Sequence, residues 1–134
     1  MKQKGLLKAL EDRVNAYFEE HNSKARITQG YGMTEAVAAV AFTFEGTNEP
    51  GAIGIPMVGA DIKICKIDTC DELPLGEEGE ICISGPTVMM GYYNNQEETD
   101  KIIKTHSDGK RWLHSGDLGY ITPDGIIYFT QRLK

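Results

Sequence analysis

The chain has 134 residues, of which 40% are hydrophobic and 25% charged, and its formal net charge at pH 7 is −6. This length fits one domain, and the composition is that of a globular protein. Lys and Arg are scattered along the chain, which disfavours a nucleic-acid partner because phosphate backbones are bound through clustered cations. No apolar run approaches the roughly 20 residues that span a bilayer, and the start does not resemble a secretory signal. We therefore expect a cytoplasmic protein.

The first expected element is an amphipathic helix over residues 3–20. Its apolar positions recur at helical spacing and are Leu6, Leu7, Leu10, Val14, Tyr17 and Phe18. Asn22 and Ser23 are expected to end this helix, and a short strand over residues 26–29 to follow it. The apolar run at residues 35–44 fits either a helix turn or a buried strand, because periodicity alone does not distinguish them.

The pattern changes after residue 44. Residues 45–60 are rich in glycine and proline and predict a connecting loop. Isoleucines then alternate with other residues at 61–64 and 80–83, as in strands with one face on the core. Between these two strands, residues 73–79 carry a turn signal.

The last third of the chain continues in the same way. Asn95 followed by Glu98 resembles a capping box, which predicts a short helix to about Lys104. Two further strands are expected at residues 112–121 and 126–130, joined by a tight turn. The predicted fold class is therefore α+β, with an N-terminal amphipathic helix followed by a mostly antiparallel, β-rich subdomain.

The cysteines and histidines show no metal or disulfide pattern in the sequence. The three cysteines are Cys65, Cys70 and Cys82, and their spacing matches neither a disulfide framework nor paired zinc ligands. Cys65 and Cys82 lie in strand-like runs, where a reduced cysteine behaves as a small hydrophobe. We therefore expect a reducing compartment. His106 and His114 have no partner at metal-ligand spacing and are predicted to be structural.

Residues 29–35 read Gln-Gly-Tyr-Gly-Met-Thr-Glu and carry the strongest functional signal. Glycines on both sides of Tyr31 let the backbone lie close to a flat ligand, and the ring offers a face for stacking. The hydroxyl of Thr34 suits a phosphate oxygen, and the carboxylate of Glu35 suits a divalent cation. Taken singly, the same residues have simpler roles, with Tyr31 in the core and Thr34 as a helix N-cap.

This heptad resembles the nucleotide-binding signature of the adenylate-forming enzymes, a superfamily of acyl-CoA synthetases, aryl-CoA ligases and luciferases. Three more segments resemble that superfamily in the same order. They are residues 76–93 (GEEGEICISGPTVMMGYY), 112–129 (WLHSGDLGYITPDGIIYF) and 128–134 (YFTQRLK). Four matching segments in order are a far more specific signal than a single Gly-x-Gly.

The resemblance implies an enzyme that activates a small-molecule carboxylic acid with ATP as acyl-AMP and passes the acyl group to CoA. ATP or AMP, Mg²⁺ and CoA are the implied cofactors and acceptor. Thr34 and Glu35 would be catalytic, Glu35 would also hold the metal, and Lys134 would be the interdomain hinge. The implied nucleotide-binding residues are Gln29, Gly30, Tyr31, Gly32, Thr34, Asp117 and Arg132.

Asp117 and Arg132 also have chemistry that suits this role. The two oxygens of Asp117, which is expected on a turn after Gly116, can accept from both ribose hydroxyls. Arg132 carries a permanently charged fork for ribose or phosphate oxygens. The simpler alternatives are a turn residue bonded to its own backbone and a solvated charge at a strand end.

Parts of the superfamily pattern are missing. No Ser/Thr/Gly-rich phosphate loop with a lysine occurs in these residues, and neither does the small domain that carries the adenylating lysine. Gln131 also stands where many members have glycine or aspartate. We therefore expect the C-terminal part of a large AMP-binding domain, with helix, strand and nucleotide motif at residues 1–44 and a β-rich subdomain up to the hinge at 45–134. Such a piece should be inactive without the upstream and downstream parts of the same enzyme.

Two other functions remain open. One is an adenylation domain that loads an amino acid onto a carrier protein, although residues 29–36 (QGYGMTEA) resemble the acyl- and aryl-CoA branch more closely. The other is a non-catalytic module that binds nucleotides or a protein.

Overall fold

The computed structural model describes residues 2–133, with side chains from residue 5 onward. Its helical elements are α1 (Lys2–Glu20), the 3₁₀ turn η1 (Thr34–Ala36) and α2 (Gln96–Ile102). Its strands are β1 (Gly30–Gly32), β2 (Ala39–Phe42), β3 (Ala52–Pro56), β4 (Asp61–Cys65), β5 (Gly79–Ser84), β6 (Ile103–Thr105), β7 (Arg111–Ile121) and β8 (Ile127–Arg132). One long helix is thus followed by mostly β structure, and the α+β prediction is confirmed.

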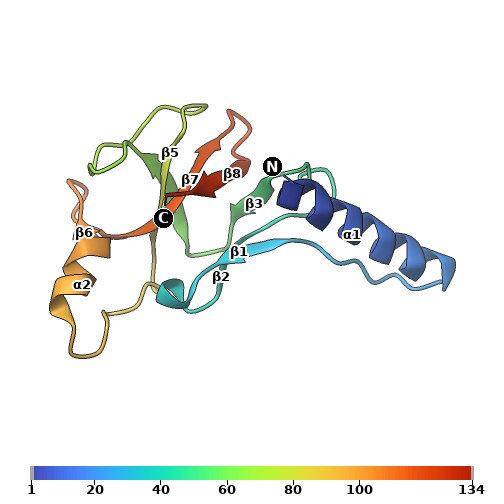
Figure 1. Cartoon of the computed structure of the whole chain (residues 1–134), viewed down its shortest axis with the longest axis horizontal. Helices are drawn as coiled ribbons and strands as arrows, with labels where there is room; N and C mark the ends of the chain where they lie inside the picture. The colour runs from blue at the N-terminus through green and yellow to red at the C-terminus, as the bar shows by residue number, and fades with distance from the viewer. Residues whose placement is uncertain (1, 134) are drawn as a thin grey trace.

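The strands form an eight-stranded sheet in the order β1-β2-β3-β8-β7-β5-β4, and β6 pairs with β7 outside this path. All pairings between these named strands are antiparallel. In Figure 1, helix α1 projects from one end of the molecule, whereas α2 and β6 lie at the opposite end. The sheet therefore joins β1, from the start of the chain, to β8, from its end, through β2 and β3.

The core is centred on β5, all six of whose residues are buried. β5 pairs with β4 along one edge and with β7 along the other. Ile81 and Ile83 have 0% exposed surface, and burying an aliphatic side chain of this size contributes roughly 1.5–3 kcal/mol. Leu113 of β7 and Ile127 of β8 belong to the same cluster. This core holds β7 and β8 in a fixed register.

The first third of the chain differs from expectation in one strand. Residues 26–29, predicted as a strand, form none, and pairing begins one residue later at Gly30, opposite Phe42. The ladder with β2 ends there because the N–H of Gln29 donates to the side-chain oxygen of Thr43, at 2.9 Å, and not to a backbone carbonyl. The run at 35–44 contains both of its alternatives, since η1 is followed by β2.

The predicted loop at residues 45–60 is wrong in its middle, which forms β3. This strand lies between β2 and β8, a long-range pairing that local composition does not reveal. Gly54 has a φ of +88° at the point where the register with β8 shifts. A glycine at a register shift is typical of a β-bulge, which bends a strand.

The helix predicted after Asn95 is confirmed but ends earlier than expected. The side chain of Asn95 accepts a hydrogen bond of 3.2 Å from the backbone N–H of Glu98, as an N-cap does. The helix ends at Ile102 rather than about Lys104. The next residues, Ile103–Thr105, pair with β7 instead, so tertiary pairing overrides helix propensity here.

Helix α1 is also confirmed, and its end is formed by Asn22 and Ser23 as predicted. Asn22 has a φ of 57°, and the N–H of Ser23 bonds the carbonyl of Phe18 at 2.8 Å. Much of its apolar face is exposed in this chain. The exposed fractions are 70% for Leu6, 54% for Leu7, 54% for Leu10 and 56% for Tyr17. No helix among the described residues combines the length and apolar character needed to cross a membrane.

Two polar side chains attach α1 to the rest of the molecule. The amide of Asn15 exchanges two hydrogen bonds with the backbone of Ile27, at 2.8 and 3.2 Å. The buried carboxylate of Glu11 accepts from the side-chain amides of Gln29, at 3.1 Å, and Asn48, at 2.6 Å. These bonds orient the helix without burying its apolar face.

Gly32 occupies the tightest position in β1. A Cβ atom there would lie 1.8 Å from the carbonyl oxygen of Ala38, which is a backbone atom. At Gly30 the nearest neighbour is the ring of Phe42, at 3.2 Å. The chain's own packing therefore demands glycine at position 32, independently of any ligand.

We expect Gly32→Ala to lower the free energy of unfolding by more than about 2 kcal/mol, because the backbone must shift to admit a methyl group. The matched control is Gly30→Ala, for which we expect a loss below about 1 kcal/mol because a side chain can give way. Urea unfolding followed by circular dichroism measures both. Equal losses would show that the close approach to Ala38 does not constrain this strand.

Candidate nucleotide site

A buried carboxylate joins three predicted site residues. Asp117 is 3% exposed. The hydroxyl of Tyr31 donates to its Oδ2 at 2.8 Å, and Nε of Arg132 donates to its Oδ1 at 3.0 Å. The structure therefore brings together the Tyr31, Asp117 and Arg132 that were selected from separate segments of the sequence.

The strands explain how these side chains meet. Asp117 of β7 and Arg132 of β8 are directly opposite each other in the antiparallel register, so their side chains lie on the same face. Tyr31 comes from β1, 86 residues before Asp117. Asp117 is not on a turn, as predicted, but inside β7. Gly116, with a φ of +73°, bends the strand locally, which explains why a turn was predicted at this position.

A pocket of about 340 Å³ lies beside this carboxylate, and we call it the Asp117 pocket. It is lined by Leu7, Gln29, Gly30, Tyr31, Gly32, Gly51, Ala52, Ile53, Asp117, Phe129 and Arg132. Its volume falls in the range of small-molecule sites. Burial raises the pKa of the Tyr31 hydroxyl, and its hydrogen bond to Asp117 acts in the same direction. Tyr31 therefore stays a neutral donor to the carboxylate.

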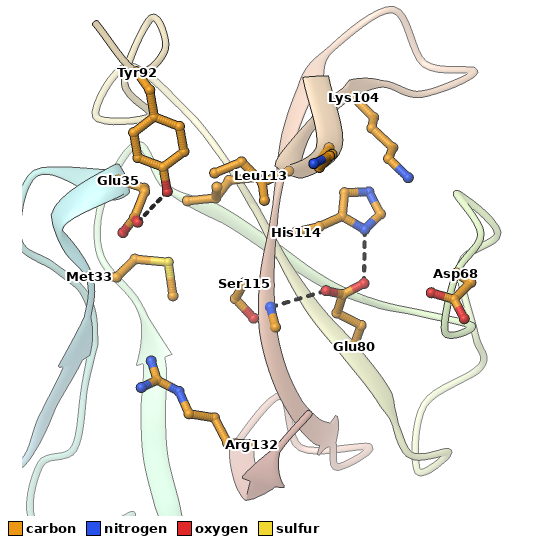
Figure 2. A pocket seen from close by; sticks show the side chains of 13 residues that line it. Met33, Glu35, Asp68, Glu80, Tyr92, Lys104, Leu113, His114, Ser115 and Arg132 are labelled. Carbon is orange, nitrogen blue, oxygen red and sulfur yellow. Dashed lines mark hydrogen bonds and ion pairs between the residues drawn. The ribbon is translucent and has the colours of Figure 1, made fainter. Parts of the chain in front are cut away.

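A second pocket, of about 520 Å³, contains Glu35, and we call it the Glu35 pocket. Its lining is Met33, Glu35, Asp68, Glu80, Tyr92, Lys101, Ile102, Lys104, Leu113, His114, Ser115, Gly116 and Arg132. Figure 2 shows the hydroxyl of Tyr92 directed at the carboxylate of Glu35, and the distance between the oxygens is 2.7 Å. This hydrogen bond, with a smaller effect of burial, raises the pKa of Tyr92 to about 12.

Thr34 and Glu35 are positioned by the short turn η1. The residue that caps this turn is Met33, and it makes no side-chain capping bond, so the alternative in which Thr34 is the N-cap is wrong. Thr34 is exposed. The carbonyl of Glu35 accepts from the N–H of Met89 at 2.9 Å, which fixes the turn against the loop after β5.

The remaining predicted residues have different surroundings. Gln29 lines the Asp117 pocket, but its amide donates to Glu11 of helix α1. Arg132 lines both pockets and is 68% exposed at its side chain. The predicted hinge residue Lys134 lies outside the described residues.

The Glu35 pocket also contains a pair of buried polar residues that sequence reasoning did not select. Glu80 of β5 accepts from Nδ1 of His114 at 2.9 Å, a contact drawn in Figure 2. It also accepts from the N–H of Gly116 at 3.0 Å. Burial alone would raise the pKa of Glu80, but these two hydrogen bonds outweigh it, so that the pKa is lowered. Tyr92 was also missed, although it lies in the Gly-Tyr-Tyr of segment 76–93.

A model of the AMP-binding enzymes matches residues 4–93, about two thirds of the chain. The chain belongs to this family. Among characterised relatives, it is 41% identical to 4-coumarate–CoA ligase 1 of Glycine max, over 95% of this chain and 42% of that protein. It is also 41% identical to luciferin 4-monooxygenase of Photinus pyralis, over 81% of this chain and 19% of that protein.

Solved structures of this family share the fold. A long-chain-fatty-acid–CoA ligase from Archaeoglobus fulgidus superposes on 94% of this chain and 26% of its own, with a TM-score of 0.82 and 29% identity. An AMP complex of O-succinylbenzoate CoA synthetase from Bacillus subtilis covers 78% of this chain and 21% of its own, with a TM-score of 0.65 and 31% identity. The chain thus spans less than half the length of these relatives, and the fold is that of part of their large domain.

The two tyrosine–carboxylate bonds give a matched comparison. We expect Tyr31→Phe to cost about 1–3 kcal/mol of stability, because it removes a donor from a buried charge. Tyr92→Phe should cost less than about 1 kcal/mol, since Tyr92 is 39% exposed and water can replace its hydroxyl. Urea unfolding of both variants measures the difference. A larger loss for Tyr92→Phe would contradict this account of Asp117.

Proposed function

We propose that this chain forms one side of the nucleotide site in an AMP-forming acid–CoA ligase, as the C-terminal part of its large domain. The observation that carries this proposal is the Tyr31–Asp117–Arg132 cluster beside a pocket of suitable volume. Family membership supports the same function. By the proposed division, residues 1–44 carry the nucleotide motif and residues 45–134 the β-rich subdomain that ends at the hinge, Lys134.

The surroundings of Asp117 suit the hydroxyls of a ribose. Each carboxylate oxygen accepts one hydrogen bond in the structure, from Tyr31 or from Arg132, and each has a second lone pair available to a ligand. We propose that these accept from the 2′ and 3′ hydroxyls, while the ring of Tyr31 packs against adenine. Gln29, Gly30 and Gly32 would form the neighbouring wall.

The Glu35 pocket suits the phosphate end of the nucleotide. We propose that Thr34 donates to an α-phosphate oxygen and that Glu35 holds Mg²⁺, which would neutralise phosphate charge when bound. Tyr92 keeps the Glu35 carboxylate oriented through the 2.7 Å hydrogen bond. Because Arg132 lines both pockets, its guanidinium can contact either the ribose or the phosphate of the nucleotide.

The acyl acceptor and the location are proposed on other grounds than the geometry of the two pockets. CoA is the proposed acyl acceptor because the relatives and structural neighbours include CoA ligases that act on aromatic and fatty acids. The residues of the chain do not select one acid. We propose a cytoplasmic location on the sequence grounds given above.

We expect the chain to bind AMP and to lose at least ten-fold in affinity for 2′,3′-dideoxy-AMP, because two charge-assisted hydrogen bonds to Asp117 are then missing. Asp117→Ala should bind both nucleotides equally and weakly. Isothermal titration calorimetry measures the affinities, with Asp124→Ala, in an exposed turn, as the matched control. If the wild-type chain does not discriminate between the two nucleotides, the assignment of Asp117 is wrong.

We also expect no acid-dependent exchange of pyrophosphate into ATP with this 134-residue chain alone. The physical reason is that its residues include no lysine-bearing phosphate loop, so the β- and γ-phosphates have no binding site. Supplying a protein that contains the other parts of the enzyme should restore the exchange. Exchange by the chain alone would exclude the proposal that it forms only one side of the site.

A further inference from the structure

A row of buried polar side chains crosses β5, β7 and the end of β6. Glu80 is 8% exposed, His114 8% and His106 5%. Nδ1 of His114 lies 2.9 Å from Glu80, and its Nε2 lies 2.9 Å from Nε2 of His106. The two histidines that show no metal spacing in the sequence are thus in direct contact in the structure.

The protonation of this row follows from its contacts. The Glu80 carboxylate accepts hydrogen bonds from two directions, so Nδ1 of His114 carries a proton and its Nε2 presents a lone pair. Nε2 of His106 then donates to that lone pair. The other nitrogen of His106, Nδ1, is buried and has no hydrogen-bond partner among the described residues. A buried polar atom without a partner is costly.

A third donor lies beside the histidines. The thiol of Cys70, in the loop between β4 and β5, and one nitrogen of each histidine all lie within 4.8 Å of one another. Cys70 is exposed, whereas His106 and His114 are buried. Two nitrogens of buried side chains and the sulfur of an exposed one therefore lie close enough together to share one ion.

We propose that Cys70, His106 and His114 bind a divalent cation of the zinc class. Sulfur and imidazole nitrogen are the ligands that Zn²⁺ prefers, at roughly 2.3 and 2.0–2.1 Å. Tetrahedral geometry would place the two nitrogens about 3.3 Å apart. The observed 2.9 Å must therefore widen by a few tenths of an ångström. The proton on Nε2 of His106 must move to Nδ1, so that both Nε2 atoms present lone pairs. The thiol of Cys70 must release its proton to solvent, and its exposed loop must close on the ion. A water molecule would complete the four ligands.

Glu80 gives the proposed site the support that such centres need. A carboxylate that accepts from the outer N–H of a ligating histidine fixes the tautomer and turns the lone pair toward the metal. Glu80 makes this contact with His114. The same carboxylate accepts from the N–H of Gly116, the residue before Asp117. The proposed ion would thus be connected to the Asp117 pocket through two hydrogen bonds.

The local charges also permit a cation. Lys63 lowers the pKa of His106, after the larger effect of burial, but its ammonium lies 4.1 Å from the centre of the Trp112 ring and 3.9 Å from the carboxylate of Asp108. Glu80 and a Cys70 thiolate contribute two negative charges beside the donors. The other possible set, Glu80, Cys82 and His114, is less suitable because Cys82 is 0% exposed and packed with Trp112.

The proposed ion would cross-link three segments of the β-rich part of the chain. Its ligands come from the loop after β4, the residue after β6 and the middle of β7, so one ion would hold two hairpin ends against the same strand. His114 and Glu80 also line the Glu35 pocket, so the proposed ion would lie next to the proposed phosphate site. The binding test itself needs no AMP.

Titration of the metal-free chain with Co²⁺ tests the proposal, because a thiolate ligand gives a charge-transfer band that nitrogen and oxygen ligands do not. We expect one ion per chain with this band, and displacement of Co²⁺ by Zn²⁺. Cys70→Ser should abolish the band, and Glu80→Gln should weaken binding about 10- to 100-fold while keeping it. The control, His21→Ala, changes an exposed histidine in the turn directly after α1 and should leave binding unchanged.

Cys70 is exposed, so its variant retains the core and the result can be interpreted. Zn²⁺ should also raise the Tm of the wild-type chain and not that of Cys70→Ser. Absence of the thiolate band in the wild-type chain, or equal Zn²⁺ affinity in wild type and Cys70→Ser, would overturn the proposal.

Discussion

The hydrogen bond between Tyr31 and Asp117 is the constraint on which the shape of the molecule depends. β1 and β7 are separated by β2, β3 and β8 in the sheet. In a flat sheet with strands about 4.8 Å apart, four steps would place them roughly 19 Å from each other, beyond the reach of two side chains. The observed 2.8 Å contact therefore requires the sheet to curl. The Asp117 pocket is lined by residues of both β1 and β7, and the buried carboxylate of Asp117 holds these two strands together.

The curl is formed by irregularities in the strand pairings between β1 and β7. The register shifts between Tyr31 and Gly32, between Ala52 and Gly54, and again in the pairing of β7 with β8. Bulges of this kind bend strands and increase their twist. Gly32 and Gly54 are needed because backbone atoms of the neighbouring strand occupy the space of a Cβ. Gly32 of the nucleotide motif thus shapes the sheet first, and through it the pocket.

The sequence predicted those parts of the fold that depend on local chemistry. Helix α1, its end at Asn22, the cap at Asn95 and the strands on both sides of residues 73–79 follow from periodicity and turn residues. β3 and β6 were not predicted, because each exists through pairing with a distant strand. The cluster of Tyr31, Asp117 and Arg132 was selected through resemblance, and the direct contact among the three residues could be seen only in the folded chain. Gln29 shows the opposite case, since its side chain is engaged by Glu11.

Glu80 connects the pair of buried histidines to the segment that carries Asp117. Its carboxylate lies on the most buried strand, where an ionised group is costly unless it is fully paired. Both of its partners belong to β7, one a side chain and one a backbone N–H, and they lie on either side of Ser115. This pairing fixes the path of β7 at the point where Gly116 bends it. Asp117 emerges from that bend toward Tyr31 and Arg132. The orientation of Asp117, the residue proposed to bind the ribose, therefore depends on the carboxylate of Glu80, which lines the Glu35 pocket.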